Sequence, residues 1–130
     1  MPDNYTDLLK NTRTILLVDW PSTELPLALL KAGFEVYSYS PDNYSKAELN
    51  RDGKLNFVNL KKPPASVDIV NIFRPEEEHN EIIAKHVVLL GAKGIWLHPP
   101  VMSSFAGTLA KKLNLGFIEG INIADAANGI

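Results

Sequence analysis

Residues 66–98, with the sequence SVDIVNIFRPEEEHNEIIAKHVVLLGAKGIWLH, decide the fold of this chain. Two apolar runs flank an amphipathic stretch, and this order predicts a strand, a helix and a second strand. The helix is expected over about residues 76–90, and its buried face should carry Ile82, Ile83, His86, Val87 and Leu90. The apolar runs end in Phe73-Arg74-Pro75 and His98-Pro99-Pro100. Ligands bind beyond the carboxyl ends of strands in open parallel sheets, so we expect function at these two endings.

The segment before this unit has the same alternation. Residues 14–19 and 34–39 are predicted strands, because they are rich in apolar and β-branched residues. Residues 24–32 between them should form a helix whose N-cap is Ser22 or Thr23. These elements predict a second strand-helix-strand unit.

The remaining elements are less uniform. Residues 44–53 could form a short helix and residues 57–58 a brief extended piece. A helix capped by Ser103 or Ser104 is expected before a last strand over residues 115–118. Helical spacing predicts that its apolar stripe contains Phe105, Leu109 and Leu113.

This alternation predicts a parallel sheet with helices on both faces, since parallel strands need right-handed crossovers. The predicted fold class is α/β, a three-layer α/β/α Rossmann-like sandwich with a parallel sheet of about five strands. At 130 residues the chain is expected to form a single domain over residues 1–130. Residues 1–12 would be an N-terminal lead-in and residues 121–130 a C-terminal tail.

Composition excludes several classes of partner. A formal charge of -2 and a pI near 5.9 argue against nucleic acid, which needs a basic surface. No segment approaches the roughly 20 apolar residues of a membrane span, and cysteine is absent. The N-terminus lacks a signal-peptide core, so a cytoplasmic location is expected. The sequence leaves a homo-oligomer open.

Two linked motifs resemble those of small stand-alone CoA-binding proteins, which are similar to the nucleotide-binding domain of the succinyl-CoA synthetase α subunit. The motifs are Val67-Asp68-Ile69-Val70-Asn71-Ile72-Phe73-Arg74-Pro75 and Gly91-Ala92-Lys93-Gly94-Ile95-Trp96-Leu97. The resemblance covers nearly the whole chain from Arg13. It implies a Rossmann-like fold and non-catalytic binding of CoA or acyl-CoA, because the related ligases use a phosphohistidine from a further domain.

The chain departs from the family pattern at the expected binding edge. The family usually has a glycine-containing loop after the first strand, whereas Val18 is followed here by Asp19-Trp20-Pro21-Ser22-Thr23. The usual Asn-Pro after the second strand is Ser40-Pro41, and the usual Trp-x-Gln-x-Gly is Trp96-Leu97-His98-Pro99-Pro100. The Asp and Cys common after the last strand are replaced within residues 119–122. The alternative is a degenerate member that has lost CoA and serves as a protein-interaction module or binds another nucleotide.

Each candidate contact has a functional and a structural interpretation. Ser22 and Thr23 could donate to a phosphate at the positive end of a helix, or one of them could simply cap it. Asp19 would repel a diphosphate there, and it too could be a cap. Trp20 could stack on adenine or fill the space of a ligand. Asp42 could accept from ribose hydroxyls or act as a turn residue.

The endings of the central unit carry the remaining candidates. Arg74 offers a fork of donors for phosphate, or could pair with the acids at residues 76–78. Phe73 would be a wall for an apolar arm, and His98 a hydrogen-bonding group or a structural histidine. The predicted cofactor-binding residues are Asp19, Trp20, Ser22, Thr23, Pro41, Asp42, Phe73, Arg74, Pro75, Leu97 and His98. The sequence indicates no catalytic residue and no metal ligand.

Overall fold

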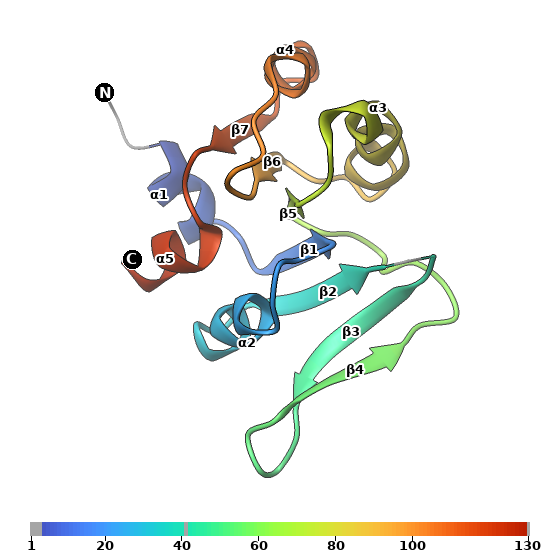
Figure 1. The fold of residues 1–130 in the computed structure, drawn as a ribbon, viewed down its shortest axis with the longest axis vertical. Coiled ribbons are helices and arrows are strands. Elements are labelled where there is room, and N and C mark those ends of the chain that lie inside the picture. Colours follow the sequence, from blue (N-terminus) through green and yellow to red (C-terminus); the bar gives the residue numbers. More distant parts are fainter. Residues whose placement is uncertain (1–3, 41, 130) are drawn as a thin grey trace.

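The computed structural model describes residues 4–40 and 42–129, which form one mixed sheet covered by helices (Figure 1). The sheet has seven strands in the order β4-β3-β2-β1-β5-β6-β7. The elements in chain order are α1 (Asn4–Lys10), β1 (Thr14–Val18), α2 (Glu24–Lys31), β2 (Glu35–Tyr39), β3 (Tyr44–Leu49), β4 (Leu55–Asn59), β5 (Ile69–Ile72), the 3₁₀ turn η1 (Glu76–Glu78), α3 (His79–Ile82), the π-helical stretch η2 (Ile83–Val88), β6 (Gly94–Leu97), α4 (Ser104–Lys112), β7 (Gly116–Glu119) and α5 (Ile123–Asn128).

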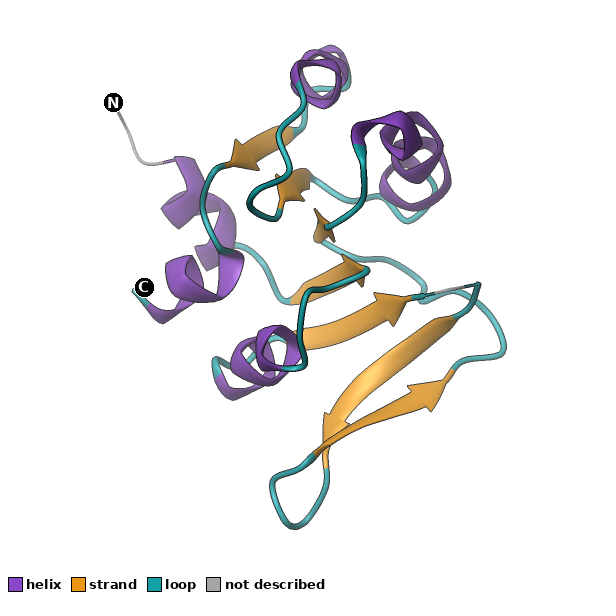
Figure 2. Cartoon of the chain, viewed as in Figure 1, coloured by secondary structure: helices purple, strands orange, loops and turns teal. Residues whose placement is uncertain are grey.

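The predicted α/β class and Rossmann-like architecture are confirmed, but the sheet is larger than predicted. Strands β2, β1, β5, β6 and β7 form the expected parallel sheet of five. Strands β3 and β4 add an antiparallel hairpin at one edge. Figure 2 shows this hairpin extending beyond the helical layers.

The prediction of a short helix over residues 44–53 is wrong. The side chains of β3 alternate between the two sides of the sheet, with Tyr44 in one core cluster and Ala47 in the other. The hairpin turn is held by Asn50, whose side-chain oxygen accepts hydrogen bonds from the backbone of Asp52 and Lys54. Gly53 follows with a φ of 77°, a conformation that glycine adopts without strain. The alternating burial of these side chains and the turn at residues 50–53 therefore determine the structure here, and not the helical spacing of the sequence.

Helices cover both faces of the parallel strands (Figure 1). On one face, Val18, Val70 and Ile72 pack with apolar side chains of α3, η2 and α4 in a single buried cluster. On the other face, Leu17 and Ile69 belong to a cluster that includes side chains of α1, α2 and α5. The three-layer arrangement follows from these two clusters. Within the described residues, no helix has the length and apolarity needed to cross a bilayer.

The sequence predicted the buried faces of two helical segments, and one of them is fully confirmed. All five side chains predicted on the buried face of residues 76–90 are buried: Ile82, Ile83, His86, Val87 and Leu90. The predicted stripe of α4 is right at Leu109, which packs against a core cluster, and wrong at Phe105 and Leu113, which are 44% and 40% exposed while Ala106 and Ala110 are buried. Gly107 explains the difference, because a Cβ there would lie 3.1 Å from the ring of Phe117. The helix packs closely on β7 through its small residues.

Residues of the two family-like motifs hold together the amino ends of the parallel strands, which we call the amino edge of the sheet. Both Arg13 and Thr14 donate backbone hydrogen bonds to the carboxylate of Asp68, at 2.8 and 3.1 Å. The side chain of Lys93 donates to the carbonyl of Asn11, and its backbone N–H donates to the carbonyl of Asp68 at 2.8 Å. These contacts join the starts of β1, β5 and β6.

We expect Asp68→Ala to lower the free energy of unfolding by about 2 kcal/mol, because two backbone donors lose a charged acceptor. Urea unfolding followed by circular dichroism measures the change. Asp52→Ala, at the exposed hairpin tip, is the matched control and should change stability by less than about 0.5 kcal/mol. Equal stabilities of the two variants would show that Asp68 does not hold the edge.

Candidate functional site

The strand order creates a topological switch point between β1 and β5. The crossover after β1 runs through α2 on one face, whereas the crossover after β5 runs through η1-α3-η2 on the other. Ligand sites in open α/β sheets lie at such points, at the carboxyl ends of the strands. The backbone N–H of Phe73 donates to the carbonyl of Val18 at 3.0 Å, so Asp19 and Arg74 leave adjacent strand ends.

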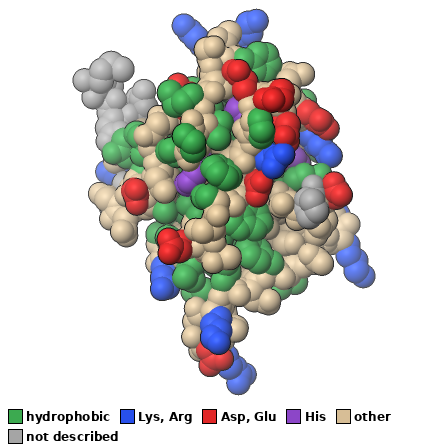
Figure 3. Space-filling view, viewed as in Figure 1, with side chains coloured by type: hydrophobic (Ala, Val, Ile, Leu, Met, Phe, Trp, Pro, Cys, Tyr) green, Lys and Arg blue, Asp and Glu red, His purple; other side chains and the backbone are tan. Residues whose placement is uncertain are grey.

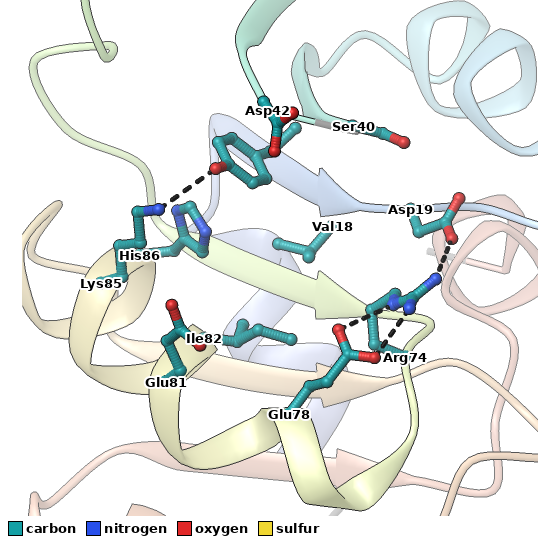
Figure 4. A pocket seen from close by; sticks show the side chains of 11 residues that line it. Val18, Asp19, Ser40, Asp42, Arg74, Glu78, Glu81, Ile82, Lys85 and His86 are labelled. Carbon is teal, nitrogen blue, oxygen red and sulfur yellow. Dashed lines mark hydrogen bonds and ion pairs between the residues drawn. The ribbon is translucent and has the colours of Figure 1, made fainter.

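Arg74 bridges the switch point and is held by two carboxylates (Figure 4). Its Nη1 donates to Asp19 Oδ2 at 3.0 Å, and its Nε and Nη2 donate to the two oxygens of Glu78 at 3.0 and 2.7 Å. The hydrogen bonds that Arg74 donates to Glu78 and then to Asp19 raise the pKa of Arg74, and those it donates to Glu78 lower the pKa of Glu78. The pairing with an acid of residues 76–78 was expected from the sequence, but the pairing with Asp19 was not.

The loop after β1 is shaped by Asp19 and not by a helix cap. Asp19 has a φ of 63°, in the left-handed region, and its side chain accepts a hydrogen bond from the backbone N–H of Trp20 at 2.9 Å. Thr23 is the N-cap of α2, yet its side chain makes no capping hydrogen bond. Ser22 and Thr23 are both exposed. Asp19 is therefore the first residue after β1, at the start of the loop that the family resemblance predicts to contain glycine.

A pocket of about 320 Å³ opens beside this ion-pair network (Figure 4). Its lining residues are Val18, Asp19, Tyr39, Ser40, Asp42, Arg74, Glu78, Glu81, Ile82, Lys85 and His86. Apolar and aromatic side chains form its walls, and charged side chains form its rim. Four carboxylates face two cations, so the pocket is acidic. Figure 3 shows acidic side chains gathered over η1 and α3 on this side of the molecule.

One wall of the pocket contains a buried tyrosine–histidine pair. The hydroxyl of Tyr44 lies 2.5 Å from Nδ1 of His86, and the ring of Tyr39 packs 4.3 Å from the His86 ring. Burial, followed by the charge of Lys85, lowers the pKa of His86 to about 4. Burial, followed by Tyr39, raises the pKa of Tyr44 to about 12. Both groups are neutral at pH 7, so the Tyr44 hydroxyl donates to Nδ1 and the proton of His86 resides on Nε2.

The structure brings three of the sequence-predicted residues together around the pocket: Asp19, Asp42 and Arg74. Trp20 lies elsewhere and stacks on Phe57 with ring centroids 5.3 Å apart. Phe73 contacts His98 edge to face at 5.5 Å, on the far side of the strands. Leu97 is fully buried, Pro75 is exposed, and Pro41 lies outside the described residues.

Lining residues that sequence reasoning did not assign to a site include Tyr39, Glu81 and Lys85, and it also missed Tyr44, which contacts the lining residue His86. Two signals could have located three of them. The alternation of residues 34–39 directs Tyr39 to the same face as Tyr37, and helical spacing aligns Glu78, Glu81 and Lys85 along one side of the crossover helix. The partner of His86 could not be found in this way, because Tyr44 is 42 residues away.

We expect a pH-dependent loss of stability caused by His86. Its pKa is about 4 in the fold and near 6.5 in the unfolded chain, so between these values the unfolded state binds more protons. Stability is therefore complete above about pH 6.5 and falls toward pH 4, by up to about 3 kcal/mol. His86→Gln, whose amide oxygen can still accept from Tyr44, should flatten urea-unfolding stability across this window.

A smaller slope should remain in the variant, because burial also lowers the pKa of His98. Parallel stability curves for the wild type and His86→Gln would contradict the assignment to His86.

The comparisons with known proteins agree with this fold. The family model described as a CoA binding domain matches residues 18–125. Among solved structures, a Thermus thermophilus protein, cell-free ID.343, is 15% identical, with a TM-score of 0.71 over 97% of this chain and 95% of its own. A conserved hypothetical protein from Pyrococcus furiosus is 22% identical, with a TM-score of 0.60 over 88% of this chain and 98% of its own. The family match covers most of the sequence, and this chain belongs to the family of CoA-binding domains.

Proposed function

We propose that the protein is a non-catalytic binder of CoA or acyl-CoA. The observation that carries the proposal is the position of Arg74, a cation at the switch point with a pocket directly beside it. The adenosine part would lie against Tyr39 and His86 in the pocket. The diphosphate would contact Arg74 and the first turn of α2, and the pantetheine arm would continue past the ends of β5 and β6.

The two ion pairs of Arg74 do not prevent this arrangement. The side chains involved are 33–41% exposed, and ion pairs of such exposure contribute about 0–1 kcal/mol each. A diphosphate can accept from two guanidinium N–H groups at once, as Glu78 does here, whereas Asp19 accepts from one. Replacing the Asp19 contact of Arg74 by a phosphate oxygen therefore costs little free energy. The displaced carboxylate must move away from the ligand.

The charge of the pocket favours a second candidate, a family member that no longer binds CoA. Asp19 already occupies the place of an anion at the switch point, and Asp42 and Glu81 add negative charge to the rim. Such a member would bind a less anionic nucleotide or a protein partner. The two candidates differ in one measurable respect, namely whether Asp19 weakens the binding of a diphosphate.

Calorimetry with CoA, acetyl-CoA and NAD(P) tests the proposal. We expect the wild type to bind CoA at micromolar concentration and Asp19→Gly to bind it about tenfold more tightly, equivalent to about 1.4 kcal/mol. Glycine removes the repelling charge and suits the φ of 63° at this position. Asp52→Gly is the control, because it removes the same charge at the hairpin tip and should leave the affinity unchanged.

Binding of NAD(P) alone, or of none of these ligands, would overturn the proposal in favour of the second candidate. Equal affinity of the wild type and Asp19→Gly for CoA would show that Asp19 does not lie at the diphosphate.

A further inference from the structure

Asn71 is a polar residue in the centre of the sheet whose side chain has no hydrogen-bond partner among the described residues. It lies on β5 with 0% exposure, and both its Oδ1 and its Nδ2 are buried without a hydrogen bond within the described residues. Its neighbours in register are Leu17 on β1 and Trp96 on β6, which are apolar and fully buried. Buried amides are almost always hydrogen-bonded, so this one requires an explanation.

A second unpaired polar group lies beside it. His98 follows β6, is 5% exposed, and its Nδ1 is buried without a partner in the described part of the chain. The backbone N–H of His98 donates to the carbonyl of Ile72, which places His98 alongside Phe73. Strand alternation directs Asn71, Phe73 and His98 to the same face of the sheet, the face covered by α2 and α5. The pocket at Arg74 opens on the opposite face.

The three side chains are arranged by depth from the carboxyl edge. Phe73 and His98 lie past the strand ends, with their rings edge to face at 5.5 Å, and Asn71 lies one same-face position further in. Phe73 is half-buried. Along the strands, the two rings therefore lie between Asn71 and the carboxyl ends. A ligand that enters from that end would have to pass between them.

We propose that Asn71 binds an amide group of a ligand that passes between the rings of Phe73 and His98. The Oδ1 of Asn71 would accept from the ligand N–H and its Nδ2 would donate to the ligand carbonyl, which satisfies both atoms at once. The neighbours of Asn71 in register, Leu17 and Trp96, are apolar and carry no charge, so an uncharged arm fits and a phosphate does not.

The ligand class depends on the proposed function: the amide would be one of those in the pantetheine arm of CoA. The diphosphate would stay at Arg74, and the arm would cross the edge of the sheet to the α2 and α5 face. An unpaired asparagine that destabilises the free protein is then explained by the contact it makes in the complex, since functional sites often violate local packing rules.

Asn71→Leu tests the proposal, because leucine has a similar volume and no polar atom. We expect the variant to unfold at a higher temperature than the wild type, since an unpaired amide has been removed from the core. Calorimetry should show at least a tenfold loss of affinity for CoA and an unchanged affinity for ADP, which lacks the arm.

Asn59→Leu is the matched control for the substitution. The Oδ1 of Asn59 accepts hydrogen bonds from Ser45 and Asn43 at 3.0 Å each, in the β3–β4 hairpin. This variant should unfold at a lower temperature and keep the affinities for CoA and ADP. His98→Phe is a second test that does not require the Asn71→Leu variant to fold. It should lower the affinity for CoA several-fold and leave the affinity for ADP unchanged.

The outcomes separate this inference from the proposed function. Full CoA affinity in both Asn71→Leu and His98→Phe would overturn the amide site and leave the proposed function standing. No CoA binding by the wild type would overturn the proposed function. In that case the amide site is tested by measuring the binding of pantetheine. Binding by the wild type and not by Asn71→Leu supports the site, and binding by neither overturns it.

Discussion

The arrangement of the molecule depends on the point where β1 and β5 lie side by side and their crossovers leave on opposite faces. That divergence leaves the strand ends uncovered, and the chain bridges them with the Arg74 guanidinium and the Asp19 carboxylate. The bridge has two consequences. It holds Asp19 in a left-handed conformation above the start of α2, and it leaves Arg74 with both of its donor edges in use. Ligand binding at this edge must exchange these partners.

The two family-like motifs reach from the amino ends of the strands to their carboxyl ends. Asp68 and Lys93 join the amino ends of three strands, and Gly94 leaves room for Leu8, whose Cδ2 would lie 2.9 Å from a Cβ at that position. At the carboxyl ends, the first motif supplies Arg74, whereas Asp19, which pairs with it, lies outside both motifs. The motifs can therefore be kept while Asp19 and other residues outside them make the pocket acidic.

The sequence predicts those features that depend on neighbours along the chain. The five parallel strands, the buried face of residues 76–90 and the cap at Ser103 follow from local patterns, and all of them are present. The hairpin was missed because its strands are partly polar and partly exposed, so its burial depends on β2 and α2. The pairs Asp19–Arg74 and Tyr44–His86 span 55 and 42 residues, and no local pattern records which partner a charge or a ring will find.

Three departures from ordinary packing lie in the inner strands or at their carboxyl ends: the left-handed Asp19, and the amide of Asn71 and the Nδ1 of His98, which have no partner among the described residues. Others lie elsewhere, since Asn114 before β7 is also left-handed and the Nδ1 of His79 in α3 is also buried without a partner in the described part of the chain. A requirement for ligand contact would account for the three near the switch point, because selection would then retain groups there that destabilise the free protein.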